Sequence, residues 1–172
     1  NREKLDAAAF KLQHKLSEKP IIALLPGSRK QEITEMLSVM LSVVSDFPEY
    51  QFVIAGAPGQ EYSYYQQVLK KDSIIFISNK TYDLLSLSTA ALVTSGTATL
   101  ETALFKVPEV VCYKGNWISY QIAKRVVTLK YISLVNLIMD RPVVAELIQS
   151  DCNTKRIREE LTKILNPTHR AH

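Results

Sequence analysis

Cysteine is scarce in this chain, which argues against a disulfide framework and against a cysteine-based metal site. Only 2 of the 172 residues are cysteines, Cys112 and Cys152. Cys112 lies in the apolar run Val110–Tyr113, where a free thiol packs as a small hydrophobic group. We therefore expect a protein of a reducing compartment, with no bound metal and no cofactor.

Long apolar runs and a strong excess of charge are also missing. No run approaches the ~20 residues of a membrane-spanning helix, and no secretory signal opens the sequence. The formal net charge of +4 is too small to indicate a nucleic-acid binder, so we expect no nucleic-acid partner. This charge is compatible with anionic small molecules or with an anionic membrane surface.

Three signatures of nucleotide or hydrolytic chemistry are absent. There is no Gly-x-x-x-x-Gly-Lys-Ser/Thr loop, no Gly-x-Gly-x-x-Gly after a predicted strand, and no Gly-x-Ser-x-Gly elbow. These absences argue against nucleotide hydrolysis, dinucleotide redox chemistry and hydrolase chemistry. His14 stands on a predicted surface helix with no obvious nucleophile. We interpret the chain as a binding domain without a complete set of catalytic groups.

Short apolar segments alternate with amphipathic helical patterns in the first two thirds of the chain. The predicted strands are 21–25, 51–55, 74–77, 91–94 and 110–113, and helical patterns precede and separate them. This alternation predicts a Rossmann-like α/β fold, in which a parallel sheet carries helices on both faces. A length of 172 residues with 47% hydrophobic content fits one such domain.

After Tyr113 the strand pattern stops, and we expect a C-terminal helical extension. Helices are predicted over 117–130, 143–149 and 154–165, with a loop around Asn136. The chain begins with Asn1 rather than Met, so we interpret residues 1–165 as one domain excised from a larger protein. Residues 166–172 are expected to form a disordered tail.

The loop after the first predicted strand has the composition of an anion site. Parallel sheets bind ligands at the edge where such loops meet helix N-termini. Gly27 lets the backbone approach a ligand, Ser28 adds a hydroxyl, and Arg29 offers paired donors to an anion. The alternative is a simple turn with an exposed arginine, and the residues alone favour neither reading.

The loop Thr94–Glu101 lies between a predicted strand and a predicted helix. Ser95 and Thr97 suit either a helix cap or a phosphate contact, because the start of a helix favours negative charge. Glu101 follows one turn later, on the same side, where a carboxylate could accept both hydroxyls of a ribose. A glutamate that is favoured only by the helix dipole is an alternative that the residues support at least as well.

A third region, from Tyr113 to Tyr131, mixes aromatic and basic residues. Such a mixture on an amphipathic helix suits the interface of an anionic membrane. It suits a domain interface or a solvated helix face equally well.

These motifs carry a resemblance to a known family. Leu25–Arg29 with Glu32 and Ile33 resembles the phosphate loop of lipid-A-disaccharide synthases, and TSGTATLE at 94–101 resembles their second signature. The segment Val110–Lys114 and the blocks 122–138 and 146–149 follow in the same order, so that the resemblance spans about residues 20 to 150. One departure is Val135, where the family commonly has proline.

The resemblance implies the C-terminal, nucleotide-sugar-binding domain of a GT-B glycosyltransferase. The family's reaction joins UDP-2,3-diacylglucosamine to 2,3-diacylglucosamine 1-phosphate, giving lipid A disaccharide 1-phosphate and UDP without a metal. The general base and the acceptor-lipid site are expected in an N-terminal domain that lies outside this chain. We therefore expect the chain alone to bind UDP weakly and to have no transferase activity.

Carried over by position, the resemblance assigns roles to individual residues. The candidate diphosphate contacts are Gly27, Ser28, Arg29, Ser95, Gly96 and Thr97. Glu101 would hold the ribose, and Asn136 would lie in the cleft near the donor phosphates or the sugar. The backbone near Ser78 is a candidate contact for uracil, and Lys114 is a further candidate donor contact.

The resemblance also implies a cytoplasmic location, peripheral on the inner membrane of a Gram-negative cell. Apolar helix faces that suit a partner domain would favour a homodimer or a domain swap. Two other functions stay open from the sequence. One is the donor domain of another UDP-sugar enzyme of the GT-B fold, an epimerase or a peptidoglycan glycosyltransferase, and the other is a non-catalytic α/β interaction module.

Overall fold

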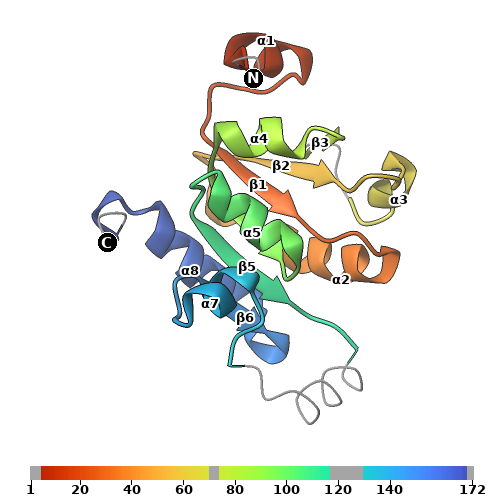
Figure 1. Ribbon diagram of the computed structural model, residues 1–172. Coiled ribbons are helices and arrows are strands. Elements are labelled where there is room, and N and C mark those ends of the chain that lie inside the picture. The colour runs from red at the N-terminus through yellow and green to blue at the C-terminus, as the bar shows by residue number, and fades with distance from the viewer. Residues whose placement is uncertain (1–4, 70–73, 117–129, 170–172) are drawn as a thin grey trace.

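A six-stranded parallel sheet forms the centre of the computed structural model, which describes residues 5–69, 74–116 and 130–169 (Figure 1). Its strands are β1 (Ile21–Leu25), β2 (Gln51–Gly56), β3 (Ile75–Ser78), β4 (Ser88–Thr94), β5 (Glu109–Tyr113) and β6 (Ala145–Ile148). They lie in the order β3-β2-β1-β4-β5-β6, and all neighbouring strands are parallel. The order thus reverses between β1 and β4, in the middle of the sheet.

Helices cover both faces of the sheet, as the sequence predicts. The described helices are α1 (Ala7–Gln13), α2 (Lys30–Leu41), α3 (Tyr62–Gln66), α4 (Thr81–Leu87), α5 (Thr97–Leu104), α7 (Leu134–Met139) and α8 (Thr154–Leu165). Successive side chains of a strand point to opposite faces, so β1 contributes to two cores. Ile22 packs in the core that holds Ile33 of α2 and Ile157 of α8, whereas Ala23 packs in the core that holds Leu84 of α4.

The five predicted strands are all present. Four of them begin within one residue of the predicted start, and β4 begins at Ser88 instead of residue 91. The predicted helix over 154–165 is α8 with the same bounds. In the segment 1–16 the described helix is limited to α1.

The region after Tyr113 differs from the predicted helical extension. The predicted helix over 143–149 is wrong, because Ala145–Ile148 forms β6 and pairs with β5, with Glu146 opposite Val111. The pairing satisfies the backbone groups along the outer edge of β5. The predicted loop around Asn136 is the helix α7. The predicted helix over 117–130 lies almost wholly outside the described residues.

The described part of the predicted tail is short. Residues Pro167–His169 form a 3-10 turn directly after α8, and residues 170–172 lie outside the described ranges. Two other 3-10 turns, Val44–Asp46 and Gln149–Asp151, precede β2 and α8.

Candidate functional site

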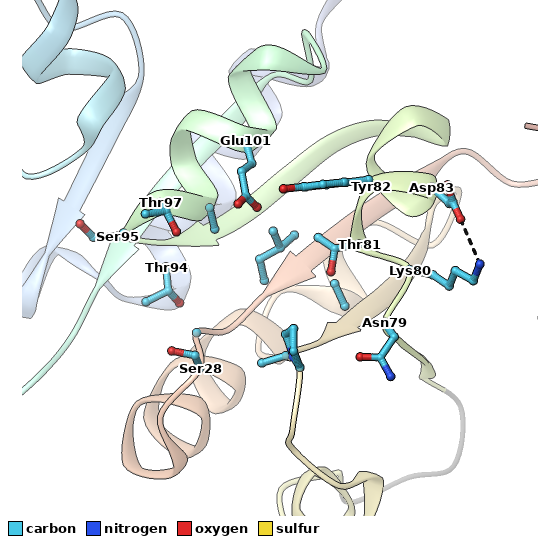
Figure 2. Close-up of a pocket in the computed structure, with 17 residues that line it drawn as sticks. Ser28, Asn79, Lys80, Thr81, Tyr82, Asp83, Thr94, Ser95, Thr97 and Glu101 are labelled. Carbon is cyan, nitrogen blue, oxygen red and sulfur yellow. Dashed lines mark ion pairs between the residues drawn. The ribbon is translucent and has the colours of Figure 1, made fainter. Parts of the chain in front are cut away.

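An open cavity of about 580 Å³ lies at the C-terminal edge of the sheet (Figure 2). The ends of three strands reach it through Leu25, Ala55 and Thr94, and the starts of α4 and α5 line it further. The strand order reverses between β1 and β4, so the connections that follow these two strands diverge and leave a crevice. The cavity therefore occupies the place where doubly wound sheets bind their ligands.

The loop from β1 to α2 forms one side of the cavity. Gly27 has a φ of +104°, in the left-handed region that favours glycine. The carboxylate of Glu32, in the first turn of α2, accepts hydrogen bonds from the backbone N–H groups of Ser28 at 3.1 Å and Arg29 at 3.5 Å. A Cβ atom on Gly27 would overlap this carboxylate. A carboxylate of the chain itself thus occupies N–H groups that the sequence analysis assigns to a phosphate.

The loop after β2 is fixed against the loop after β1. Gln60 donates a hydrogen bond from Nε2 to the carbonyl oxygen of Ser28 at 3.0 Å. The phenol oxygen of Tyr65 accepts one from the N–H of Ala57 at 3.0 Å. Tyr65 is fully buried, and this burial raises the pKa of its phenol. These contacts position Ala57 and Pro58, which line the cavity.

The loop from β4 to α5 forms the opposite side. Gly96 has a φ of +149°, and α5 begins directly after it at Thr97. Gly96, Thr97 and Ala98 all line the cavity, so the N-terminus of α5 opens onto it. The N–H groups at the start of a helix have no partner within the helix and carry partial positive charge. Figure 2 shows Glu101 extending from α5 toward Tyr82 of α4.

Ser95 lines the cavity, but its hydroxyl has a partner elsewhere. This hydroxyl donates a hydrogen bond to the carbonyl oxygen of Ile132 at 3.1 Å, and the N–H of Ser95 donates one to the carbonyl oxygen of Cys112 at 3.1 Å. Figure 2 shows the Ser95 side chain directed away from the other labelled residues. Ser95 therefore connects the loop after β4 to the segment that precedes α7.

The start of α4 contributes a large part of the lining, although none of its residues is among the predicted site residues. The lining residues of this segment are Asn79, Lys80, Thr81, Tyr82 and Asp83. Lys80 and Asp83 form an ion pair with a distance of 3.6 Å between Nζ and Oδ2 (Figure 2). A signal existed, because the loop after the third predicted strand must reach the same sheet edge as the other loops.

Four predicted contacts lie outside this lining, namely Arg29, Ser78, Lys114 and Asn136. Arg29 is exposed at the start of α2, and it forms no ion pair with the residues that the structure describes. Ser78 lines an adjoining hollow that it shares with Tyr62 and Phe76. Lys114 is exposed after the end of β5.

The structure gives Asn136 a position different from the predicted one. Its side chain is 1% exposed and does not line the cavity. The amide oxygen accepts hydrogen bonds from the N–H groups of Val143 at 2.7 Å and Val144 at 2.9 Å. The amide nitrogen donates to the carbonyl oxygen of Val144 and to Oε1 of Glu146, both at 2.9 Å. Val143 and Val144 belong to the connection from α7 to β6 and Glu146 to β6 itself, so the amide holds that connection against the strand.

Within residues 5–69, 74–116 and 130–169, no group of three or more His, Cys, Asp and Glu side chains is placed to hold a metal ion. Over the same ranges, no helix has the length and apolar character needed to cross a membrane.

Comparison with known proteins identifies the family. The profile of the lipid-A-disaccharide synthetase family matches residues 1–172. The lipid-A-disaccharide synthase of Rhodospirillum centenum is 32% identical over 170 residues, which are 94% of this chain and 42% of that protein. The enzyme of the same name from Syntrophus aciditrophicus is 39% identical over 156 residues, 87% of this chain and 41% of that protein. The chain thus spans about two fifths of the length of these relatives.

Solved structures show the same fold at low sequence identity. The S. aureus MnaA–UDP co-structure has a TM-score of 0.60 at 14% identity and covers 99% of this chain and 42% of that one. The glycosyltransferase of kitacinnamycin has a TM-score of 0.56 at 11% identity and covers 99% and 38%. These likenesses confirm the predicted α/β fold class, and the family match confirms the resemblance found in the motifs. The chain belongs to the lipid-A-disaccharide synthase family.

Proposed function

We propose that the cavity binds the UDP part of a sugar nucleotide, and that this chain is the donor-binding part of a lipid-A-disaccharide synthase. The observation that carries the proposal is the position of the cavity, between two glycine-containing loops at the point where the strand order reverses. Family membership supports the choice of donor. The co-structure of S. aureus MnaA with UDP has the same fold and supports a uridine nucleotide as the ligand.

The diphosphate belongs between the two loops. The starts of α2 and α5 face it with partial positive charge, and the space beside Gly96 is open to its oxygens. Arg29 is exposed at the rim, so its guanidinium is free to turn toward the diphosphate when the donor binds. The carboxylate of Glu32 must then give up at least one of the N–H groups that it holds.

The nucleoside lies toward α4. Glu101 accepts hydrogen bonds from the ribose hydroxyls, because its carboxylate extends from α5 into the space beside Tyr82 (Figure 2). The base then lies near the end of β3, where Ser78 and Asn79 line the adjoining hollow.

The proposed reaction transfers the 2,3-diacylglucosaminyl group from UDP to the hydroxyl of 2,3-diacylglucosamine 1-phosphate. The bond between the anomeric carbon and the β-phosphate oxygen breaks, so negative charge develops on the leaving UDP. The helix starts, and the Arg29 guanidinium once it has turned toward the bound diphosphate, stabilise this charge. The base that takes the acceptor proton, and the acceptor site, lie outside the residues of this chain in the proposal.

A peripheral membrane contact is part of the same proposal. Large apolar side chains are exposed at the end of α5 and on and after α7: Leu104 (74%), Ile138 (66%), Met139 (49%) and Val143 (47%). Exposed basic residues lie next to these side chains in the sequence: Lys106 follows α5, and Lys130 and Arg141 flank α7. Apolar side chains with basic neighbours suit an anionic lipid surface. Flotation with vesicles that contain phosphatidylglycerol, and with neutral vesicles as the control, tests this contact.

Calorimetric titration of UDP into the chain tests the donor site. We expect saturable binding that Glu101→Gln weakens by about tenfold or more, because a charged acceptor of two hydroxyls is lost. Arg29→Ala should weaken UDP binding more than uridine binding. Glu49→Gln is the matched control, since Glu49 is exposed before β2, at the opposite edge of the sheet. Binding that is equal in the Glu101 and Glu49 variants would refute the assignment.

A further inference from the structure

Thr94 is a buried residue whose hydroxyl has no partner. It is the last residue of β4, and its side chain is 3% exposed. Its Oγ1 atom has no hydrogen-bond partner in the part of the chain that the structure describes. A buried hydroxyl without a partner destabilises a fold, because the hydroxyl has lost its hydrogen bonds to water.

The neighbouring threonines behave differently. Thr99 and Thr102 of α5 are also buried, but Thr99 donates a hydrogen bond to the carbonyl oxygen of Gly96 at 2.8 Å, and Thr102 donates one to that of Ala98 at 2.7 Å. Valine has nearly the same shape as threonine and is equally suited to a strand. The hydroxyl of Thr94 therefore contributes no hydrogen bond to the fold of the described residues, and a role in ligand binding explains its presence.

The position of Thr94 supports that role. Five buried side-chain atoms lack a partner in the described ranges, and they belong to His14, Thr94, Glu109 and Gln149. Of these four residues, Thr94 is the one that lines the cavity. Figure 2 shows it between Ser28 and Thr97, and thus between the two loops that flank the crevice.

We propose that the hydroxyl of Thr94 donates a hydrogen bond to an oxygen of the bound diphosphate, which makes Thr94 a further donor-contact residue of this site. The inference rests on the proposed function, because it needs a diphosphate between the two loops. Phosphate oxygens only accept hydrogen bonds, so they suit a hydroxyl that has a free proton. Thr94 lines the cavity and its hydroxyl oxygen is buried without a partner, so a change of its χ1 rotamer as the donor binds would direct the hydroxyl to the ligand.

The variants Thr94→Val and Thr94→Ser test the inference. Valine removes the hydroxyl and keeps the shape, whereas serine keeps the hydroxyl and removes the methyl group. We expect Thr94→Val to raise the Kd for UDP about tenfold, the loss of one hydrogen bond to a charged group, and Thr94→Ser to change it less than threefold. The Kd for uridine, followed by ligand-observed NMR, should be the same for all three proteins.

Urea unfolding of the unliganded proteins completes the test. Thr94→Val should unfold at the same urea concentration as the natural chain or at a higher one, because an unpartnered buried hydroxyl is removed. Unfolding at a clearly lower concentration would overturn the inference, since the hydroxyl would then have a structural role. Equal UDP affinity of the natural chain and Thr94→Val would overturn it as well, and would leave the donor site intact. Absence of UDP binding to the natural chain would instead contradict the proposed function itself.

Discussion

The carboxylate of Glu32 accepts a hydrogen bond from the backbone N–H of Ser28 at 3.1 Å, and the same oxygen reaches the N–H of Arg29 at 3.5 Å. This carboxylate takes the place that we propose for a phosphate oxygen of the donor. Glu32 and the diphosphate therefore compete for the same N–H groups, while Glu32 also keeps the loop in shape before the donor arrives.

Replacing Glu32 by glutamine separates these two effects. The amide oxygen of glutamine still accepts hydrogen bonds from the loop, but they are weaker than those to a carboxylate, and repulsion of the diphosphate is removed. We expect Glu32→Gln to lower the Kd for UDP by a factor of about three to ten in a calorimetric titration. Glu32→Ala loses the cap as well, so its free energy of unfolding should fall by about 1 kcal/mol. Weaker UDP binding by Glu32→Gln would show that the charge helps the donor to bind.

Gly27 is required by the same contact. Alanine at this position would adopt an unfavourable φ of +104°, and its Cβ would also displace the Glu32 carboxylate. We expect Gly27→Ala to lower the free energy of unfolding by about 2 kcal/mol and to weaken UDP binding, because the loop changes shape. Gly59→Ala is the control, since Gly59 has a φ of +79° but open space around the added Cβ. A loss of stability no greater than that of the control would contradict the argument.

Much of the fold was predictable, because the first five strands and the helices between them repeat one simple pattern. The strand β6 was not, since the segment Ala145–Ile148 includes Glu146 and lacks the continuous apolar character of a buried strand. Tertiary contacts explain this exception. The carboxylate of Glu146 accepts hydrogen bonds from the N–H groups of Ile132 and Ser133 at 3.1 and 2.9 Å, so its polarity is satisfied inside the structure.

The candidate site was predictable in part for a similar reason. Glycine next to hydroxyl or basic residues after a strand is a local pattern, and it led to the loops at Gly27 and Gly96, both of which line the cavity. The segment Asn79–Asp83 has no such local pattern, and only the strand order places it at the cavity. The hydrogen-bond partners of Asn136 belong to β6 and to the connection before it, so its burial depends on a strand that the sequence did not predict.

Asn136→Ala tests the structural role of that amide. The substitution removes the acceptor of the Val143 and Val144 N–H groups and the donor to Glu146. We expect the free energy of unfolding to fall by about 2–4 kcal/mol, because several buried polar groups lose their partners together. At a temperature where the variant is folded, its Kd for UDP should be within a factor of two of that of the natural chain. A large loss of UDP affinity with an unchanged free energy of unfolding would show that Asn136 contacts the donor.

Glu109 makes the stability of the chain depend on pH. Its side chain is 2% exposed at the start of β5, and neither carboxyl oxygen has a partner in the described ranges. Burial raises the pKa of this carboxyl from 4.5 to about 8. The folded chain therefore keeps the proton at pH values where the unfolded chain has lost it. The stability that depends on a protonated Glu109 carboxyl is fully present below pH 4.5, and it is lost as the pH rises toward 8.

Urea unfolding at several pH values between 5 and 9 measures this effect. Between the two pKa values, the difference in the free energy of unfolding between Glu109→Gln and the natural chain should grow in favour of the variant by up to about 1.4 kcal/mol per pH unit. Above pH 8 the difference should stay constant, because Glu109 is then ionised in both states. Glu49→Gln serves as the control for the removal of a carboxylate, since Glu49 is exposed. Parallel curves for Glu109→Gln and the natural chain would mean that the carboxyl at position 109 ionises equally in the folded and unfolded states.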